Sequence, residues 1–147
     1  MTHAVIVAEL ADIMELRVRV LRKGTPVSHC NYPEDKLPDV VHLAIFGNDG
    51  AIGTSTWFSK ECPERPGVRA VQLKGMAVDE HLHGAGLGAL LVNSGLGLAR
   101  SRDAEIVWAR ARDSALGFYE RLGFEAVGDG FIDEPTGMPH HIVVREV

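Results

Sequence analysis

The chain has 147 residues, of which 46% are hydrophobic and 24% are charged, and its formal net charge at pH 7 is −5. This length and composition predict one soluble domain over residues 1–147 with a sizeable hydrophobic core. The negative charge argues against a nucleic-acid partner, which needs a basic face, but it leaves room for a local cationic pocket that holds a small anion.

The N-terminal stretch carries no targeting signal. It lacks a basic start followed by a long apolar run, and acidic residues enter at Glu9 and Asp12. The sequence therefore predicts neither a signal peptide nor a membrane span. Two cysteines, Cys30 and Cys62, are too few for a disulfide framework, so we expect a reducing, cytoplasmic setting.

The first elements are a strand and a helix. A short apolar run predicts a strand near Ala4 to Ala8. Apolar residues then recur at helical spacing and predict a helix over Ala11 to Arg22. Arg17 occupies one of these otherwise apolar positions. The following stretch, Lys23 to Pro38, is a loop with room for one helical turn. Loops of this length are often functional.

A hairpin and a further strand follow. "VVHLAIF" (residues 40–46) and "AIGTSTWFS" (residues 51–59) flank "GNDG", in which Asp49-Gly50 is a hairpin signal. "RAVQLKGMAVD" (residues 69–79) predicts the next strand. Gly75 in its middle indicates either a plain bulge or a close approach of the backbone to another group.

The C-terminal half alternates helices and strands. A helix is predicted from about Gly86 to Arg102, although Gly95 and Gly97 each cost roughly 1 kcal/mol there relative to alanine. "EIVWARA" (residues 105–111) predicts a strand, and "DSALGFYERLGF" (residues 113–124) a short helix with Ser114 as its N-cap and Gly123 just past its end. "FEAVG" and "HHIVVREV" close the chain as strands. The mixed order implies one sheet with helices on its faces.

The stretch "HLHGAGLGALLV" (residues 81–92) places Gly84, Gly86 and Gly88 at the start of a helix. The three glycines can let the helix pack closely on its neighbours, or expose backbone N–H groups to a diphosphate. Gly84, Gly86 and Ala89 also fit the dinucleotide fingerprint, but "DEHLH" separates them from the strand end, where that fold places its glycines. A phosphate loop is excluded because no Gly-Lys pair exists in the chain.

Two segments, "LKGMAVDEHLHGAGLGALLV" and "ARDSALGFYERLGF", resemble the GNAT acetyltransferase family. In that family a strand leads to an Arg/Gln-x-x-Gly-x-Gly/Ala turn and a helix. Gly86 and Gly88 match this motif, whereas its leading position is His83. A later family helix carries Ala-x-x-Phe-Tyr-x-x-x-Gly-Phe, which is matched here by Ala115, Phe118, Tyr119, Gly123 and Phe124.

The resemblance covers residues 71 to 127 closely, and "ELRVRVLR" and "GMPHHIV" also look like segments of small bacterial relatives. It implies an α/β (α+β) GNAT fold, with a central mixed, mostly antiparallel twisted sheet of about six to seven strands flanked by helices on both faces. It also implies acetyl-CoA as co-substrate, with its pyrophosphate on backbone N–H groups of Gly84 to Gly88. His83 supplies a full charge there only when it is protonated.

The family chemistry implies direct transfer of an acetyl group to a primary amine, with Tyr119 as the general acid that protonates the CoA sulfur. From the residues alone, Tyr119 beside Phe118 reads as a core aromatic. Backbone N–H groups near Met76 or Ala77 would face the thioester carbonyl. The residues expected to bind the cofactor are Met76, Ala77, Val78, His83, Gly84, Ala85, Gly86, Leu87, Gly88, Ser114, Phe118 and Arg121.

The base and the acceptor stay open. Glu80, His81, His140 or a water chain are all conceivable bases. Two histidines two residues apart, with no matching acid or cysteine cluster, are more often surface residues, so no metal is expected.

The acceptor is expected to be a small-molecule or peptide amine, bound between the first helix with its loop and the segment "GDGFIDEPTGMPH". Three acids in that segment would suit a cationic amine, or form a solvated loop: Asp129, Asp133 and Glu134. Arg110 and Arg112 would meet CoA phosphates or be solvated, and many relatives have Asn in place of Arg112. A homodimer is left open, and a non-catalytic acyl-CoA-binding regulator is the rival function.

Overall fold

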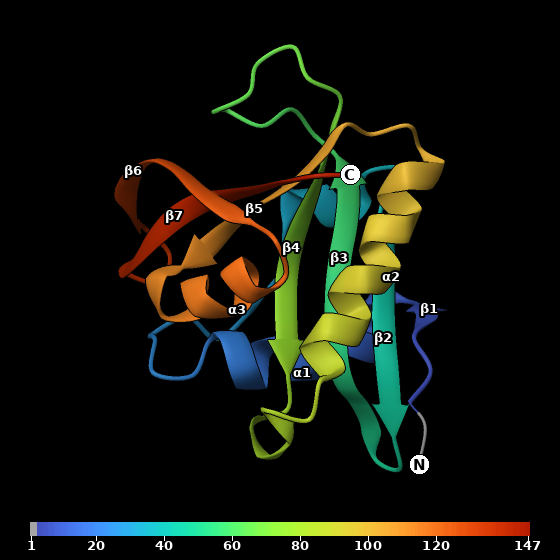
Figure 1. The fold of residues 1–147 in the computed structure, drawn as a ribbon. Coiled ribbons are helices and arrows are strands. Elements are labelled where there is room, and N and C mark those ends of the chain that lie inside the picture. Colours follow the sequence, from blue (N-terminus) through green and yellow to red (C-terminus); the bar gives the residue numbers. More distant parts are fainter. Residues whose placement is uncertain (1–2) are drawn as a thin grey trace. The chain divides into compact units, whose positions relative to one another are not determined.

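The computed structural model describes residues 3–147 and contains a seven-stranded sheet with the order β1-β2-β3-β4-β5-β7-β6 (Figure 1). The recorded strand pairs β1–β2, β2–β3, β5–β7 and β6–β7 are all antiparallel. The strands are β1 Ile6–Ala8, β2 Val41–Gly47, β3 Gly50–Ser59, β4 Ala70–Val78, β5 Ile106–Arg112, β6 Glu125–Asp133 and β7 Met138–Glu146, and the α-helices are α1 Leu10–Leu21, α2 Leu87–Ser101 and α3 Leu116–Arg121.

The backbone contacts divide the chain into two compact units. The first consists of Met1–Phe58 and Leu73–Gly95, and the second of Ser59–Gln72 and Leu96–Val147. Strands β3 and β4 and helix α2 each begin in one unit and end in the other. The sheet and its helices confirm the predicted fold class. A single domain over residues 1–147 stays a prediction.

The predicted hairpin forms in the first unit. Strands β2 and β3 pair from Val41↔Trp57 to Gly47↔Gly50, so Asn48 and Asp49 are the two loop residues. Gly50 has φ 127°, a conformation that favours glycine. A register shift between Ile45 and Phe46 bends the pair next to this turn.

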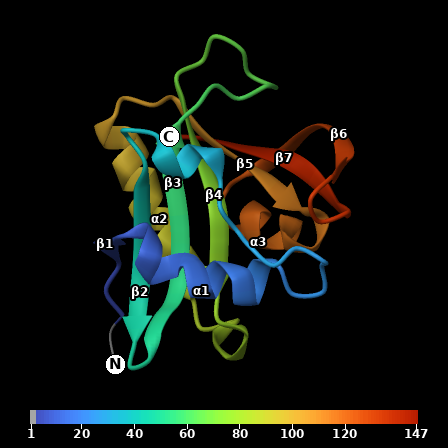
Figure 2. The same cartoon turned by 180° about the vertical axis from the view of Figure 1, so that it is seen from behind.

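Helix α1 covers one face of the first unit's strands (Figure 2). Ile13 and Leu16 are buried in a cluster with Ala44, Ala51 and Ala77 of the strands. The helix begins where the Asp12 carboxylate accepts a hydrogen bond of 3.1 Å from the Glu9 backbone N–H. The helix predicted from Ala11 to Arg22 is therefore confirmed to within one residue at each end.

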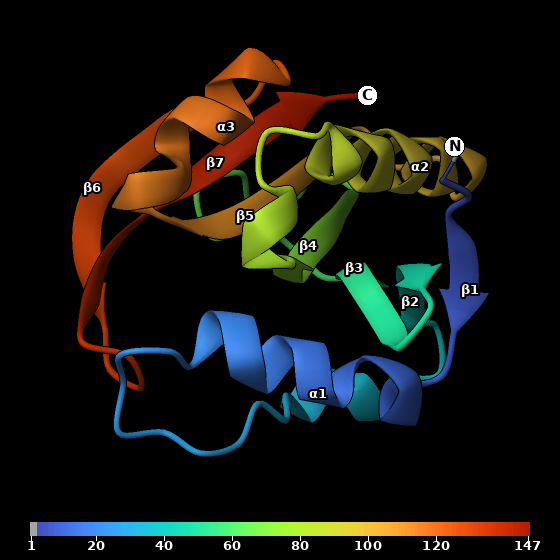
Figure 3. The same cartoon turned by 90° about the horizontal axis from the view of Figure 1, so that it is seen from below.

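The first turns of helix α2 lie on the opposite face of β2 and β3 from α1 (Figure 3). This face is crowded, because the indole of Trp57 on β3 is fully buried and donates to Ser55 Oγ at 2.8 Å. A Cβ atom at Gly95 would overlap the Trp57 ring, whereas a Cβ at the exposed Gly97 would meet nothing within 4 Å. Packing therefore requires glycine at position 95 but not at position 97.

Strands β5, β7 and β6 and helix α3 build the second unit. The end of α3 follows the expected pattern: Phe124 N donates to Tyr119 O and Gly123 N to Glu120 O, each at 3.0 Å, and Gly123 has φ 87°. This pair of bonds is a Schellman motif, which satisfies the last carbonyls of a helix.

Two local predictions in the second unit are wrong. Ser114 is not the N-cap of the helix, because it lies inside the 3₁₀ turn Asp113–Ala115, and Ala115 precedes α3 without a side-chain cap. Strand β6 does not end with "FEAVG". It bulges between Val127 and Phe131 and continues to Asp133, so most of "GDGFIDEPTGMPH" is a β-hairpin rather than a loop.

The two helix glycines predict opposite stability changes. Gly97→Ala should raise the free energy of unfolding by roughly 0.5–1 kcal/mol, since it adds helix propensity without a clash. Gly95→Ala should lower it by about 1–3 kcal/mol, because the added methyl group overpacks Trp57. Urea unfolding of the two variants measures both changes, and equal shifts would contradict the packing described here.

Candidate active site

The glycine turn joins β4 to α2 through a short 3₁₀ helix, Glu80–Leu82. Gly84 has φ 89° and Gly86 has φ 84°, both in the left-handed region that favours glycine. A Cβ atom at either position would meet nothing within 4 Å. These two glycines therefore serve the conformation of an open turn, and close packing does not explain them.

The turn presents the N-terminus of a 15-residue helix. The backbone N–H of Leu90 donates to Gly86 O at 3.2 Å, so the N–H groups of Leu87, Gly88 and Ala89 precede the first intrahelical bond. No acidic residue lies in the first turn of α2, and residues 84–86 are exposed. Free N–H groups and the positive end of a helix dipole make this turn suited to an anion such as a phosphate.

His83 ties the turn to the end of β4. Its Nε2 lies 2.9 Å from the backbone carbonyl oxygen of Val78. A carbonyl only accepts hydrogen bonds, so Nε2 carries the hydrogen and donates it. The imidazole thus links the turn to the end of β4 by a hydrogen bond and remains exposed.

Strand β4 has a left-handed backbone and a close neighbour at Gly75. Its φ is 65°, and a Cβ atom there would lie 3.0 Å from Tyr32 Cε2 and 3.3 Å from Arg17 Nε. The close-approach interpretation of this glycine therefore applies, and the approaching group is a side chain of the protein. A bulge at Gly75 stays a prediction. Met76, Ala77 and Val78 follow in the same strand and lead into the turn.

A buried arginine fixes the loop that precedes β2. Arg17 of α1 has no exposed surface and binds both carboxylate oxygens of Asp35 at 2.9 Å. It also donates to Cys30 O at 3.1 Å and to Thr56 Oγ1 at 2.7 Å. Burial opposes charge on Asp35, but the hydrogen bonds from Arg17 and the Tyr32 backbone outweigh it and lower the pKa of that carboxyl.

The same loop places an aromatic ring beside β4. Arg17 Cζ and Lys74 Nζ each lie 4.5 Å from the centre of the Tyr32 ring, and Lys74 is paired with Glu34 at 2.8 Å. Sequence reasoning missed this group. The available signal was Arg17 at an apolar position of the first helix, because a charge on that face needs a buried partner.

Tyr119 lies on α3 in the second unit and is only 6% exposed. Its ring meets Phe118 and Phe124 edge-on, with ring centres 5.1 and 5.4 Å apart. Burial raises the pKa of its phenol well above the ordinary value, so the hydroxyl keeps its proton at neutral pH. The residue is thus packed like a core aromatic.

The remaining predicted residues fall into both units. Met76 to Val78 and His83 to Gly88 are brought together in the first, at the end of β4. Ser114, Phe118 and Arg121 lie with Tyr119 in the second, where Phe118 is half-buried and the other two are exposed.

The candidate bases differ sharply in their surroundings. Glu80 is paired with Lys23 at 2.9 Å, and this bond and charge lower the pKa of its carboxyl. The side chain of His81 is 87% exposed and lies 3.3 Å from Asp79. His140 is buried within the second unit. Asp133, expected to attract a cationic acceptor, is already paired with Arg110 at 3.2 Å.

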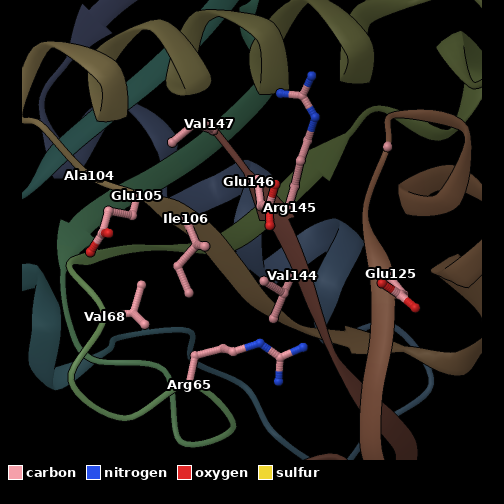
Figure 4. A pocket seen from close by; sticks show the side chains of 11 residues that line it. Arg65, Val68, Ala104, Glu105, Ile106, Glu125, Val144, Arg145, Glu146 and Val147 are labelled. Carbon is pink, nitrogen blue, oxygen red and sulfur yellow. The ribbon is translucent and has the colours of Figure 1, made fainter.

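A groove elsewhere in the second unit contains none of the residues expected to bind the cofactor or to act in catalysis. Positively and negatively charged side chains line it, including Arg65, Glu105, Glu125 and Arg145 (Figure 4). The Glu105 carboxylate there already accepts the backbone N–H of Arg69 at 3.0 Å. This groove does not add to the predicted site. Among residues 3–147, no group of three or more His, Cys, Asp or Glu side chains is arranged to hold a metal ion.

Comparison with known proteins identifies the family to which the chain belongs. Residues 11–124 match the model of the acetyltransferase (GNAT) family. The chain is 29% identical over 133 residues to YitI of Bacillus subtilis, described as an uncharacterized N-acetyltransferase, with 90% of this chain and 88% of that protein covered.

Solved structures share the fold. Escherichia coli ElaA has a TM-score of 0.76 at 20% identity, covering 99% of this chain and 100% of that one. An aminoglycoside 6'-N-acetyltransferase in complex with coenzyme A has a TM-score of 0.72 at 14% identity, covering 97% and 96%. The mostly antiparallel sheet excludes the dinucleotide-binding fold, whose sheet is mostly parallel.

The chain belongs to the GNAT acetyltransferase family and is an acyltransferase enzyme. Within residues 3–147, no helix combines the length and the apolar character needed to cross a membrane.

Proposed function

We propose that this enzyme transfers the acetyl group of acetyl-CoA to a primary amine by direct attack of the amine on the thioester. The observation that carries the proposal is the open turn at Gly84 and Gly86. It exposes backbone N–H groups at a helix N-terminus that has no acid in its first turn. The CoA complex of the aminoglycoside acetyltransferase, which has the same fold, supports CoA as the ligand.

In this proposal the turn holds the pyrophosphate and β4 holds the thioester arm. Backbone N–H groups between Gly84 and Gly88 bind the phosphates, apart from that of Ala85, which donates to Leu82 O at 3.1 Å. The helix dipole adds to the attraction. The backbone of Met76 to Val78 lies along the pantetheine, and an N–H near Met76 or Ala77 stabilises the oxyanion that develops on the carbonyl oxygen. Ser114, Phe118 and Arg121 are proposed as further cofactor contacts on the ground of the family resemblance alone.

Tyr119 acts as the general acid in the same proposal. When the C–S bond breaks, the thiolate takes the phenolic proton and leaves as free CoA. The family motif supports this role, because Tyr119 stands at its tyrosine position, and a phenol holds its proton at neutral pH. A non-catalytic CoA-binding regulator is not favoured, since the residues of the second family motif, Tyr119 included, are all retained.

We further infer a cytoplasmic setting, which the two free cysteines support: Cys30 and Cys62 are both buried and reduced. Release of free CoA thiol from acetyl-CoA, measured across a panel of amines, tests the reaction as a whole. Release with at least one amine supports catalysis. No release with any amine, despite tight CoA binding, would favour the regulator.

The turn predicts a specific loss of CoA binding. Gly86→Val should weaken acetyl-CoA binding by at least about tenfold, because a β-branched residue is strained at φ 84° and distorts the N–H groups. Titration calorimetry with acetyl-CoA, NAD and ATP measures the affinities.

Gly67→Val is the matched control for this experiment. Gly67 has φ 78° and an equally open surround, but it lies in a loop outside the proposed site. It should carry a similar strain and bind acetyl-CoA normally. Equal loss in both variants, or tight NAD binding without CoA binding, would contradict the proposed site.

Tyr119→Phe predicts a loss of rate without a loss of binding. The substitution keeps the ring and its contacts with Phe118 and Phe124, and removes only the hydroxyl. Both kcat and kcat/KM should fall about 10²- to 10⁴-fold, as expected when a general acid is lost, while CoA affinity and Tm stay nearly unchanged. A fall of less than about threefold, with chemistry rate-limiting, would make Tyr119 a core aromatic only.

A further inference from the structure

The proposed reaction needs a group that removes a proton from the acceptor. A free amine attacks a thioester, whereas an alkyl ammonium ion, with a pKa near 10.4, has no lone pair at neutral pH. Glu80 is exposed and held by Lys23, and His81 is almost fully exposed. Neither side chain lies in a water-poor setting, whereas the third candidate, His140 of the second unit, is buried.

His140 on β7 has a fixed orientation. It is 6% exposed, and its Nδ1 lies 2.9 Å from the backbone oxygen of Met138. Because a carbonyl oxygen only accepts, Nδ1 carries the hydrogen, and in the neutral ring Nε2 then carries the lone pair. The ring also stacks on Phe131, with the centres 5.8 Å apart and the planes 28° apart. The tautomer and the plane of this imidazole are thus both set by its neighbours.

Charged groups of both neighbouring strands surround His140. On β6, the Asp133 carboxylate interacts electrostatically with it. Burial works against the charge of Asp133, but the hydrogen bond from Thr136 and the charges of His140 and Arg110 prevail and lower the pKa of this carboxyl. On β5, Arg112 is the register partner of His140, and Arg110 lies over the Phe131 ring at 4.7 Å. His140 therefore has an ionised carboxylate on one neighbouring strand and arginines on the other.

We propose that Nε2 of His140 is the general base that deprotonates the acceptor amine, directly or across one water. This inference rests on the proposed function. The ammonium gives one proton to Nε2, which passes it to solvent, and the neutral amine forms the C–N bond. When the intermediate collapses and the C–S bond breaks, the nitrogen loses a second proton, which replaces the one that Tyr119 gives to the sulfur. One proton is released to solvent in each turnover.

The neighbouring histidine offers a matched control. Side chains alternate across a strand, so His141 points to the opposite face of β7 from His140. There its Nδ1 lies 2.7 Å from Asp113 Oδ1. Asparagine at either position can keep the hydrogen-bond donor in the place of Nδ1 and removes Nε2. The two substitutions therefore differ only in which face loses its imidazole.

The test compares His140→Asn and His141→Asn by the pH dependence of kcat/KM with an amine that the wild type accepts. His140→Asn should reduce kcat/KM about 10²- to 10⁴-fold at pH 7. Its activity should rise with pH and approach that of the wild type near the pKa of the free amine, where no base is needed. Added imidazole should restore part of the rate. His141→Asn should stay within about threefold of the wild type at every pH.

Three results would overturn the inference: an equal loss in both variants, a loss of the same size at every pH, or no effect of His140→Asn when chemistry is rate-limiting. Tm and CoA affinity are measured alongside, and His140→Gln replaces His140→Asn if the latter folds poorly. A failure of the proposed function is visible separately, because then the wild type itself binds no CoA or releases no thiol.

Discussion

The buried guanidinium of Arg17 is the constraint on which the first unit depends. A charge without exposed surface is stable only when its partners are in place, and removing one partner of such a pair costs about 3–5 kcal/mol. Here the partners come from three places: Asp35 and Cys30 of the long loop, and Thr56 of β3. His42 joins through Thr56 Oγ1 at 2.8 Å, and burial, followed by the charge of Arg17, lowers the pKa of its imidazole. Two segments of the long loop are thereby tied to α1 and β3.

This network reaches β4 through Gly75. The left-handed backbone at that residue lets β4 pass close to Tyr32, and the charges of Arg17 and Lys74 each lie 4.5 Å from the centre of the Tyr32 ring. Beyond it, two more left-handed glycines shape the turn that opens α2. A site that recognises phosphate through backbone N–H groups depends on these conformations more than on any one side chain. In the proposed site, this dependence leaves room for His83 at the position where the family motif has Arg or Gln.

Local signals in the sequence were sufficient for much of this architecture. Gly84 and Gly86 marked the turn, Gly123 marked the end of α3, and Asp49-Gly50 marked the hairpin, because each of these features is decided within a few residues. Long-range features were not predictable in the same way. Asp35, which neutralises Arg17, lies 18 residues away. The continuation of β6 past Val127 depends on a bulge and on pairing with β7. Ser114 does not cap α3, because it lies in a 3₁₀ turn that precedes the helix.

The second unit gives two titratable residues different surroundings. A general acid must hold its proton before the reaction, and a general base must lack one. Burial beside Phe118 and Phe124 raises the pKa of the Tyr119 phenol, and the Met138 carbonyl accepts the hydrogen on Nδ1 of His140. In the proposed reaction these surroundings position the acid and the base, respectively. Neither environment could be predicted from residue type. A Phe-Tyr pair and a His-His pair are common in sequences, and the residues that surround them are known only from the folded structure.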